Sequence, residues 1–297
     1  MITRRTFSLG LAMTGTAAGL SGAQAAGSWL DVLPEAFRRI EAGSGGRLGV
    51  MVLDTGIGAK AGHRADELFP LCSTFKFLAA AAVLARVDRG GERLDRRIPF
   101  QASDLVTYSP RTESRVGGTG MTLEELCEAA MVVSDNTAGN LLLGSIGGPT
   151  GITALARSLG DDVTRLDRIE PHLNEALAGD PRDTTSPAAM ADVLRALVLG
   201  ETALKETSRE RLKAWLLGNQ TGATRLRAGL PADWRIGEKT GTGDNGTSND
   251  VGIIWPPGRP PLVITAYLTG STASADSRNG TLAEVARAVA GAAAAAR

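Results

Sequence analysis

The chain has 297 residues, of which 43% are hydrophobic and 22% charged, so it can bury the core of one large domain or of two ordinary ones. Its 32 basic and 32 acidic residues cancel, which argues against a nucleic-acid-binding surface or one that binds anionic membranes. Two cysteines make no disulfide framework, and two histidines do not supply a zinc site of several histidines, so we predict no metal and no other cofactor.

Residues 1–25 are typical of an export signal. Arg4 and Arg5 form a basic start, residues 7–20 are weakly apolar, and the small residues of AQA (23–25) offer a cleavage site. The paired arginines resemble a twin-arginine-type signal. The apolar run is too short for a membrane anchor. We therefore expect a soluble protein, free of the membrane after cleavage, in the periplasm or outside the cell.

The expected elements change in character along the chain. A helix over 33–41 and a buried strand over 47–56 come first. The middle is mostly helical, with apolar residues at helical spacing in segments 73–89, 122–132, 137–146, 149–159, 186–199 and 205–217. Strand-like runs return only later, in WRIGEKTGTG (234–243), DVGIIWP (250–256) and LVITAYLT (262–269), before a closing alanine-rich helix.

These elements predict an α+β fold. Because the first strand cannot remain unpaired, it should join the late strands in one antiparallel sheet flanked by helices, packed on an all-helical lobe with the active site between them. The expected domains are a discontinuous α/β domain, 26–64 and 218–297, and an all-helical domain, 65–217.

One long irregular segment, RLDRIEPHLNEALAGDPRDTTSP (165–187), interrupts the helical region. Ordered loops of this length are uncommon and usually functional. Arg168 and Asp183 are placed to close its neck. As an exposed ion pair, these two residues would contribute about 1 kcal/mol or less to the stability of the folded protein.

A lysine stands in the first turn of the apolar segment LCSTFKFLAAAAVLARV (71–87). The chain contains 27 arginines and only five lysines, so Lys76 is an unusual choice of cation. A buried lysine can give up its proton and act as a base, whereas an arginine cannot. Ser73 lies three residues earlier, on the same helical face.

Two further short motifs accompany this Ser-x-x-Lys pair: SDN at 134–136, between two predicted helices, and KTG at 239–241, in a predicted strand. Together, in this order, the three motifs resemble those of the serine β-lactamases and penicillin-binding proteins. The resemblance continues through DLVTYSPRTES, RLDRIEPHLNEA and RDTTSPAAMADVLRALV and covers essentially the whole mature chain. The sequence looks like a class A β-lactamase, a hydrolase of penicillins and cephalosporins that confers antibiotic resistance.

The resemblance implies roles for the residues of the three motifs. Ser73 would be the nucleophile, with its own N–H and that of Thr242 as the oxyanion hole. Lys76 would be either the proton acceptor or the positive partner of Ser73, and the motif leaves both open. Ser134 would protonate the departing lactam nitrogen, in the positive field of Lys239.

The resemblance also implies residues that bind the substrate and residues that hydrolyse the acyl-enzyme. Glu170 with Asn174 would hold the deacylating water, after a Glu170–Pro171 bond expected to be cis. Tyr108 would form a wall of the cleft, and Asn136 would bind the acylamide side chain. Thr240 and Gly241 complete the substrate-binding strand. The only expected partner is the β-lactam, and we expect a monomer.

The partner of the substrate carboxylate departs from the commonest family pattern. Ser248 stands where many relatives have an arginine on the strand after KTG. Arg225 and Arg278 match positions that replace this arginine in other members. We favour Arg225, because TRLRAGLPADW resembles the stretch that delivers a guanidinium into the cleft.

The cysteines match neither disulfide known in the family. Ala80 and Gly243 occupy the positions that would pair with Cys127 and Cys72. We therefore predict two free thiols.

Two other interpretations of the motifs are disfavoured, and two alternative functions remain open. GTGDNG (241–246) matches a dinucleotide-binding pattern but is followed by a hairpin rather than a helix, and Ser73 lacks the G-x-S-x-G context of α/β-hydrolases. A D-alanyl-D-alanine carboxypeptidase or transpeptidase would keep the three motifs but lack the Glu170–Asn174 arrangement. A β-lactam sensor that stays acylated is the non-enzymatic alternative.

Overall fold

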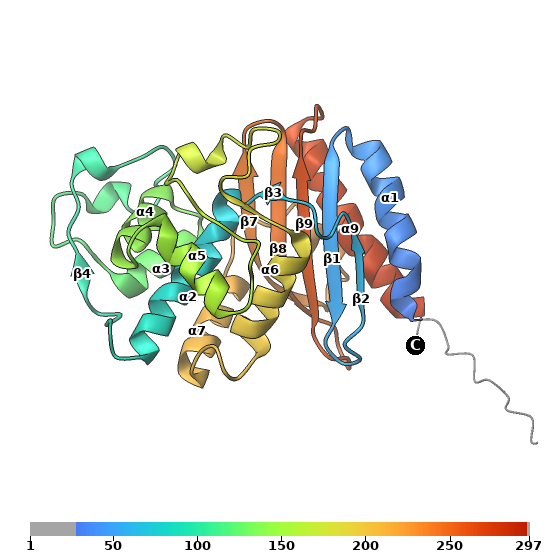
Figure 1. Cartoon of the computed structure of the whole chain (residues 1–297), viewed down its shortest axis with the longest axis horizontal. Helices are drawn as coiled ribbons and strands as arrows, with labels where there is room; N and C mark the ends of the chain where they lie inside the picture. The colour runs from blue at the N-terminus through green and yellow to red at the C-terminus, as the bar shows by residue number, and fades with distance from the viewer. Residues whose placement is uncertain (1–27, 296–297) are drawn as a thin grey trace, which may run out of the picture.

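The computed structural model describes residues 28–295, so the expected export signal lies outside the described residues. Within them, no helix combines the length and the apolar character needed to cross a membrane. Figure 1 shows a lobe of helices beside a twisted sheet. The helices are α1 Leu33–Ser44, α2 Phe75–Asp88, α3 Leu123–Val132, α4 Asn136–Ser145, α5 Pro149–Ser158, α6 Pro187–Leu194, α7 Glu206–Leu217, α8 Leu226–Gly229 and α9 Ala275–Ala295.

The main sheet joins the two ends of the chain. Its strands are β1 Arg47–Asp54, β2 Lys60–His63, β7 Arg235–Gly243, β8 Thr247–Trp255 and β9 Leu262–Thr269, in the order β2-β1-β9-β8-β7. All neighbouring strands are antiparallel, as expected. Two-stranded ladders are made by β3 Phe69–Pro70 with β6 Thr184–Thr185, and by β4 Arg97–Ile98 with β5 Met121–Thr122.

Local sequence determines where several helices begin and end. Thr122 and Glu125 form a reciprocal capping box at the start of α3, and the side chain of Asp135 accepts the Ala138 N–H at the start of α4. Gly45 ends α1 with a φ of 68°, in the left-handed region that glycine enters without steric cost.

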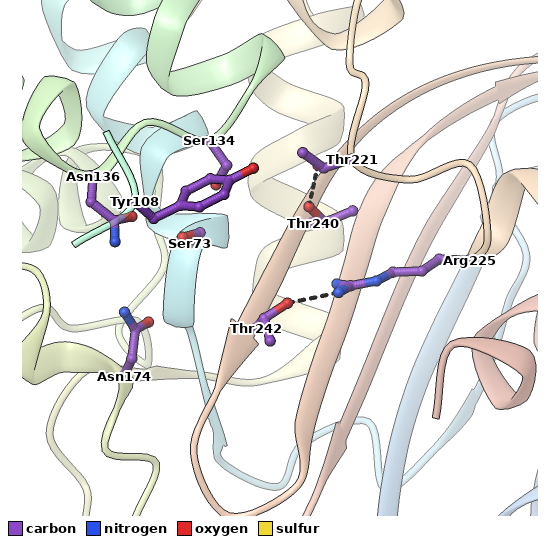
Figure 2. A pocket seen from close by; sticks show the side chains of 9 residues that line it. All are labelled: Ser73, Tyr108, Ser134, Asn136, Asn174, Thr221, Arg225, Thr240 and Thr242. Carbon is purple, nitrogen blue, oxygen red and sulfur yellow. Dashed lines mark hydrogen bonds between the residues drawn. The ribbon is translucent and has the colours of Figure 1, made fainter. Parts of the chain in front are cut away.

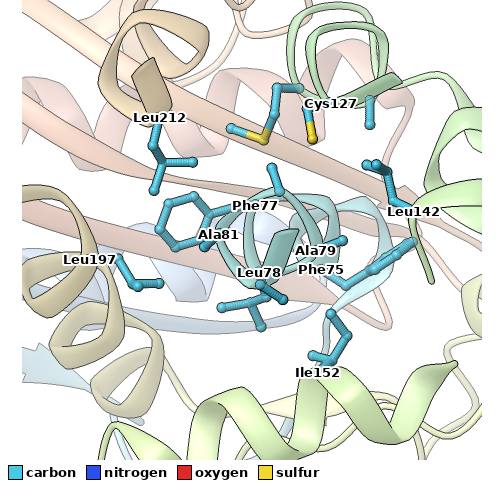
Figure 3. Close-up of a cluster of buried hydrophobic side chains, with 14 of the residues drawn as sticks. Phe75, Phe77, Leu78, Ala79, Ala81, Cys127, Leu142, Ile152, Leu197 and Leu212 are labelled. Carbon is cyan, nitrogen blue, oxygen red and sulfur yellow. The ribbon is translucent and has the colours of Figure 1, made fainter. Parts of the chain in front are cut away.

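A hydrophobic core lies on each face of the sheet. Helices α1 and α9 cover one face with residues such as Phe37 and Val289, which pack against strand residues such as Val50. The other core runs without a break from the inner sheet face into the helical lobe. Figure 3 shows its centre, where α2 presents Phe75 and Phe77 to the surrounding helices.

Some expectations need correction. The segment expected as one helix over 186–199 is α6 followed by a wider π turn, Arg195–Leu199, and α6 packs on β1 and β9. The short strand β2 and helix α8 were not expected. Because one core spans the inner sheet face and the helices, the two-domain boundaries remain a prediction.

Candidate active site

A cavity of about 430 Å³ lies between the helical lobe and the edge strand β7. Figure 2 shows side chains entering it from both sides. It is lined by Ser73, Tyr108, Ser134, Asn136, Asn174, Thr221, Arg225, Thr240 and Thr242. Eight of these nine were expected from the sequence, and Thr221 was not. The volume suits a small-molecule substrate.

Ser73 lies at the start of the central buried helix. It belongs to a short 3₁₀ turn, Cys72–Thr74, that leads directly into α2. Lys76 follows one turn later with a side chain fully buried from solvent, and its Nζ donates to Ser73 Oγ at 2.8 Å. The helix therefore brings the hydroxyl and the ammonium into direct contact on the face turned to the cavity.

Lys76 is also bonded to the other polar groups beneath the cavity. Its Nζ donates to Asn136 Oδ1 at 2.5 Å and to the Ser134 carbonyl at 2.9 Å, and it lies 3.0 Å from Glu170 Oε1. Burial lowers the pKa of Lys76 below its usual value, while the carboxylate of Glu170 opposes that shift. The amine is thus closer to losing its proton than a surface lysine.

Glu170 is held rigidly in the long loop. Its backbone N–H donates to Asn140 Oδ1, and Asn140 Nδ2 donates to its carbonyl, both at 2.9 Å. Its carboxylate accepts from Asn174 Nδ2 at 2.5 Å and from Ser73 Oγ at 3.3 Å. The Glu170–Pro171 bond is cis, as the resemblance implied. Sequence reasoning missed Asn140, which nothing but its position on α4 distinguishes.

The neck of this loop is closed by an ion pair, but not by an exposed one. Asp183 is 1% exposed, and it accepts the Arg168 Nε at 2.6 Å and the backbone N–H of Asp167 at 2.7 Å. The expectation of a solvated surface pair was therefore wrong, because the loop folds over the carboxylate. Removing one partner of a buried pair costs several kcal/mol, about 3 or more.

Two cavity residues have strained backbones. Tyr108 and Ser134 have φ values of 66° and 61°, which side chains other than glycine adopt rarely. Asp135 holds the two segments together, because its carboxylate accepts the N–H groups of Arg111 and Thr112 at 2.9 and 3.0 Å. This bonding keeps Ser134 and Tyr108 directed into the cavity from one side.

Strand β7 contributes the opposite wall. Lys239 is fully buried and donates to Ser134 Oγ and to the Thr240 carbonyl, both at 2.9 Å. Burial lowers its pKa well below the usual range, and the nearby positive charge of Lys76 adds to this. Thr240 also bonds Thr221 through their hydroxyls at 2.5 Å. Gly241 packs tightly, since a Cβ there would lie 3.0 Å from the Leu71 carbonyl oxygen.

The two candidate arginines lie in different places. Arg225 lines the cavity, where its guanidinium donates to Thr242 Oγ1 at 2.6 Å and to the Gly241 carbonyl at 2.7 Å. Arg278 does not line it. Its guanidinium bonds the Ala273 carbonyl at 2.7 Å and reaches Ser248 Oγ at 3.4 Å.

The cysteines are both free and buried, as predicted. Cys72 precedes the serine, and a Cβ placed on Gly243 would lie 2.6 Å from its Sγ. Among the described residues, no group of three or more His, Cys, Asp or Glu side chains is arranged to hold a metal ion. The arrangement therefore offers serine-based covalent chemistry: an activated hydroxyl, a carboxylate beside it and a second serine under a buried lysine.

Comparison with known proteins identifies the family of the chain. Residues 33–293 match the family model described as the β-lactamase enzyme family. The chain is 54% identical over 253 residues to β-lactamase AST-1 of Nocardia asteroides, covering 85% of this chain and 81% of that protein. It is 52% identical over 250 residues to β-lactamase CTX-M-8 of Citrobacter amalonaticus, covering 84% and 85% respectively.

Solved structures give the same result. The ancestral (GNCA) class A β-lactamase superposes with a TM-score of 0.86 at 62% identity, covering 88% of this chain and 99% of that one. A structure titled as the putative class A β-lactamase PenP from Rhodopseudomonas palustris also gives a TM-score of 0.86 at 62% identity, covering 88% of this chain and 100% of that chain.

Proposed function

The chain belongs to the class A β-lactamases, and on that premise we propose how the residues of its cleft divide the reaction between them. The protein is a serine hydrolase that opens the β-lactam ring through an acyl-enzyme and so confers β-lactam resistance. Contacts in and beneath the cavity support the side-chain roles below, and the oxyanion hole follows from the family resemblance.

Acylation begins with attack by Ser73 Oγ on the lactam carbonyl. The hydroxyl proton passes into the Lys76–Glu170 pair, whose members lie 2.8 Å and 3.3 Å from Ser73 Oγ. As the C–N bond of the ring breaks, Ser134 gives its proton to the nitrogen and receives the proton taken from Ser73 through Lys76, whose Nζ lies 3.4 Å from Ser134 Oγ. Lys239, 2.9 Å from Ser134 Oγ, stabilises the charge that develops there. The N–H groups of Ser73 and Thr242 stabilise the oxyanion.

Deacylation requires a water molecule beside the ester. Glu170 and Asn174 form a hydrogen-bonded carboxylate and amide next to Ser73, and this pair is suited to hold and deprotonate such a water. Glu170 takes a proton from the water as it adds to the ester carbonyl, and passes that proton to Ser73 Oγ as the bond between the acyl group and Ser73 breaks. This contact between Glu170 and Ser73 is the observation that carries the proposal.

Steady-state assay of the purified mature protein with the chromogenic cephalosporin nitrocefin tests the proposed hydrolysis. Continuous turnover is expected. A single stoichiometric burst without turnover would instead support the transpeptidase or sensor that shares these motifs. Ser73→Ala should remove both burst and turnover, and a Ser73→Ala protein that turned over at the wild-type rate would contradict the assigned nucleophile.

Three finer properties are also proposals. Both penicillins and cephalosporins are expected substrates, because in the family that the motifs resemble a threonine after KTG, here Thr242, suits cephalosporins as well as penicillins. The motif of residues 1–25 supports export through a twin-arginine-type route to the periplasm or the exterior. The mature enzyme is expected to be a monomer. Size-exclusion chromatography with light scattering tests the oligomeric state.

A further inference from the structure

Two carboxyl groups are buried together behind the KTG strand. Glu238 precedes Lys239 on β7, and Asp250 lies on β8. Both are 0% exposed. In the strand register Glu238 faces Gly252, and Asp250 faces Thr240, so the two side chains are diagonal neighbours on one face of the sheet. Neither group has a role in the reaction described above.

One oxygen of each carboxyl holds the segment that follows Arg225. Asp250 Oδ2 accepts the backbone N–H of Leu226 at 3.2 Å, and Glu238 Oε1 accepts Arg227 Nε at 2.9 Å. Both acceptors thus bind residues of α8, directly after the arginine that enters the cavity.

The remaining oxygen of each carboxyl has no hydrogen-bond donor. Among the described residues, Glu238 Oε2 and Asp250 Oδ1 are both buried without a partner, on side chains that are diagonal neighbours in the sheet. Two ionised carboxylates offer only acceptors, so a hydrogen bond between these neighbours requires a proton on one of them. Without that proton, the fold would be destabilised by two buried oxygens that lack hydrogen bonds and by repulsion between two neighbouring negative charges.

We propose that Glu238 and Asp250 share one proton at neutral pH and act as a positioning pair, joining β7, β8 and α8 so that Arg225 is fixed in the cavity. The role in substrate binding rests on the proposed function of Arg225. The shared proton itself does not, because it is inferred from the two unpartnered oxygens and from the neighbouring positions of the two side chains in the sheet.

The charges around the pair fit this assignment. With one proton the pair carries a single negative charge, beside the buried guanidinium of Arg225 and the half-buried one of Arg227, with the buried Lys239 next along β7. Burial raises the pKa of Asp250 well above its usual range, and the neighbouring carboxylate of Glu238 adds to that shift.

Backbone packs directly against the pair, and the two other ionisable groups that act on Arg225 lie on other elements. A Cβ on Gly222 would lie 2.1 Å from Glu238 Oε1, so the loop before Arg225 rests directly on the carboxyl with backbone alone. Two further ionisable groups act on Arg225: the thiol of Cys72, in the 3₁₀ turn before α2, and the guanidinium of Arg278 on α9. Burial raises the pKa of Cys72, so its thiol stays neutral.

Infrared spectroscopy of the full mature protein tests the proton directly. Wild type should show the C=O band of a buried protonated carboxyl at neutral pH, and Glu238→Gln should lack it. Gln can accept from Arg227 through its oxygen and donate to Asp250 through its amide, which leaves the same single negative charge. Glu201→Gln, at an exposed position, is the matched control and should keep the band.

The pH dependence of stability gives a second readout that needs no substrate. A buried acid whose pKa is raised stabilises the fold below its ordinary pKa and loses that contribution as pH rises toward the raised pKa, so the melting temperature of wild type should fall relative to that of Glu238→Gln as pH rises above about 4. The kcat/KM of Glu238→Gln for benzylpenicillin should stay within about threefold of wild type at neutral pH. The double variant Glu238→Gln/Asp250→Asn, which leaves Arg225 without its counter-charge, should lose about tenfold or more.

The possible results separate the two proposals. Absence of a protonated-carboxyl band in wild type, or its persistence in Glu238→Gln, overturns the shared proton. A band and a pH effect as expected, with unchanged kinetics in the double variant, overturn only the positioning of Arg225.

Discussion

The scarcity of lysine marks the catalytic centre at the scale of single residues. Of five lysines in a chain with 27 arginines, Lys76 and Lys239 are fully buried and both contact Ser134. Burial lowers the pKa of each. An arginine at either position would keep its proton, so the residue type here is decided by proton chemistry rather than by charge alone.

Replacing Lys76 by arginine tests this distinction. Lys76→Arg keeps a positive charge but cannot accept a proton, and we expect kcat/KM for a penicillin to fall by about 10²- to 10⁴-fold. Lys60→Arg, on the surface, is the control and should match wild type. If Lys76→Arg folds and retains wild-type kinetics, proton transfer through Lys76 is excluded.

Arg225 and Arg278 are the two candidate partners of the substrate carboxylate, and replacing each by alanine distinguishes them. Loss of a charge-assisted hydrogen bond to the substrate carboxylate costs about 1.5 to 3 kcal/mol, so Arg225→Ala should lower kcat/KM for benzylpenicillin by about 10- to 150-fold. Arg278→Ala should have little effect, because its guanidinium does not line the cavity. The reverse pattern in side-by-side kinetics would show that the carboxylate partner is Arg278.

At the scale of elements, the long loop depends on a few buried polar bonds. Asp183 accepts from Arg168 and from two backbone N–H groups, while Asn140 on α4 holds the backbone of Glu170. The loop thus transmits any loosening of its neck to the carboxylate beside Ser73.

Asp183→Asn should separate this effect from acylation. The amide cannot replace both oxygens of the carboxylate, so we expect the free energy of unfolding to fall by about 2 to 3 kcal/mol. Deacylation should slow more than acylation, which pre-steady-state kinetics would show as an accumulating acyl-enzyme. Asp162→Asn, at a position 93% exposed, is the control. Equal slowing of both steps would argue against a loop that acts through Glu170.

The limits of sequence reasoning also lie at this scale. Helices and strands with clear periodicity were predicted, and so was the pairing of β1 with the late strands, because an apolar strand must find a partner. Short elements such as β2 and α8 carry too few residues for a periodic signal. Thr221, Asn140 and the Glu238–Asp250 pair were missed because their contacts cross the fold and leave no local pattern.

At the scale of the whole molecule, one partly buried carboxylate joins helix α1 to the sheet. Glu41 on α1 accepts the Leu48 N–H at 2.9 Å, Arg64 Nε at 2.6 Å and His63 Nε2 at 2.8 Å. Burial alone would raise its pKa, but these hydrogen bonds outweigh burial and bring the pKa to about 2. A carboxyl group whose pKa is lowered in the folded protein stabilises the fold at pH values above its usual pKa. This stabilisation is lost as the pH falls toward the lowered pKa.

Glu41→Gln should therefore destabilise the protein in a pH-dependent way. We expect a loss of about 2 to 3 kcal/mol at neutral pH, shrinking as pH falls from about 4.5 toward about 2, where the wild-type carboxylate is itself protonated. Urea unfolding across this range measures the difference, with Glu284→Gln, an exposed position, as control. A difference that did not change with pH would assign Glu41 a packing role only.

The central claim is that Ser73 forms an ester which Glu170 then removes. Mass spectrometry of Glu170→Ala mixed with a penicillin tests it most directly, because the variant keeps the nucleophile and loses the base for water. We expect a persistent adduct of the whole, ring-opened penicillin, located on the peptide that contains Ser73. Rapid and complete hydrolysis by Glu170→Ala, or an adduct on any other residue, would contradict it.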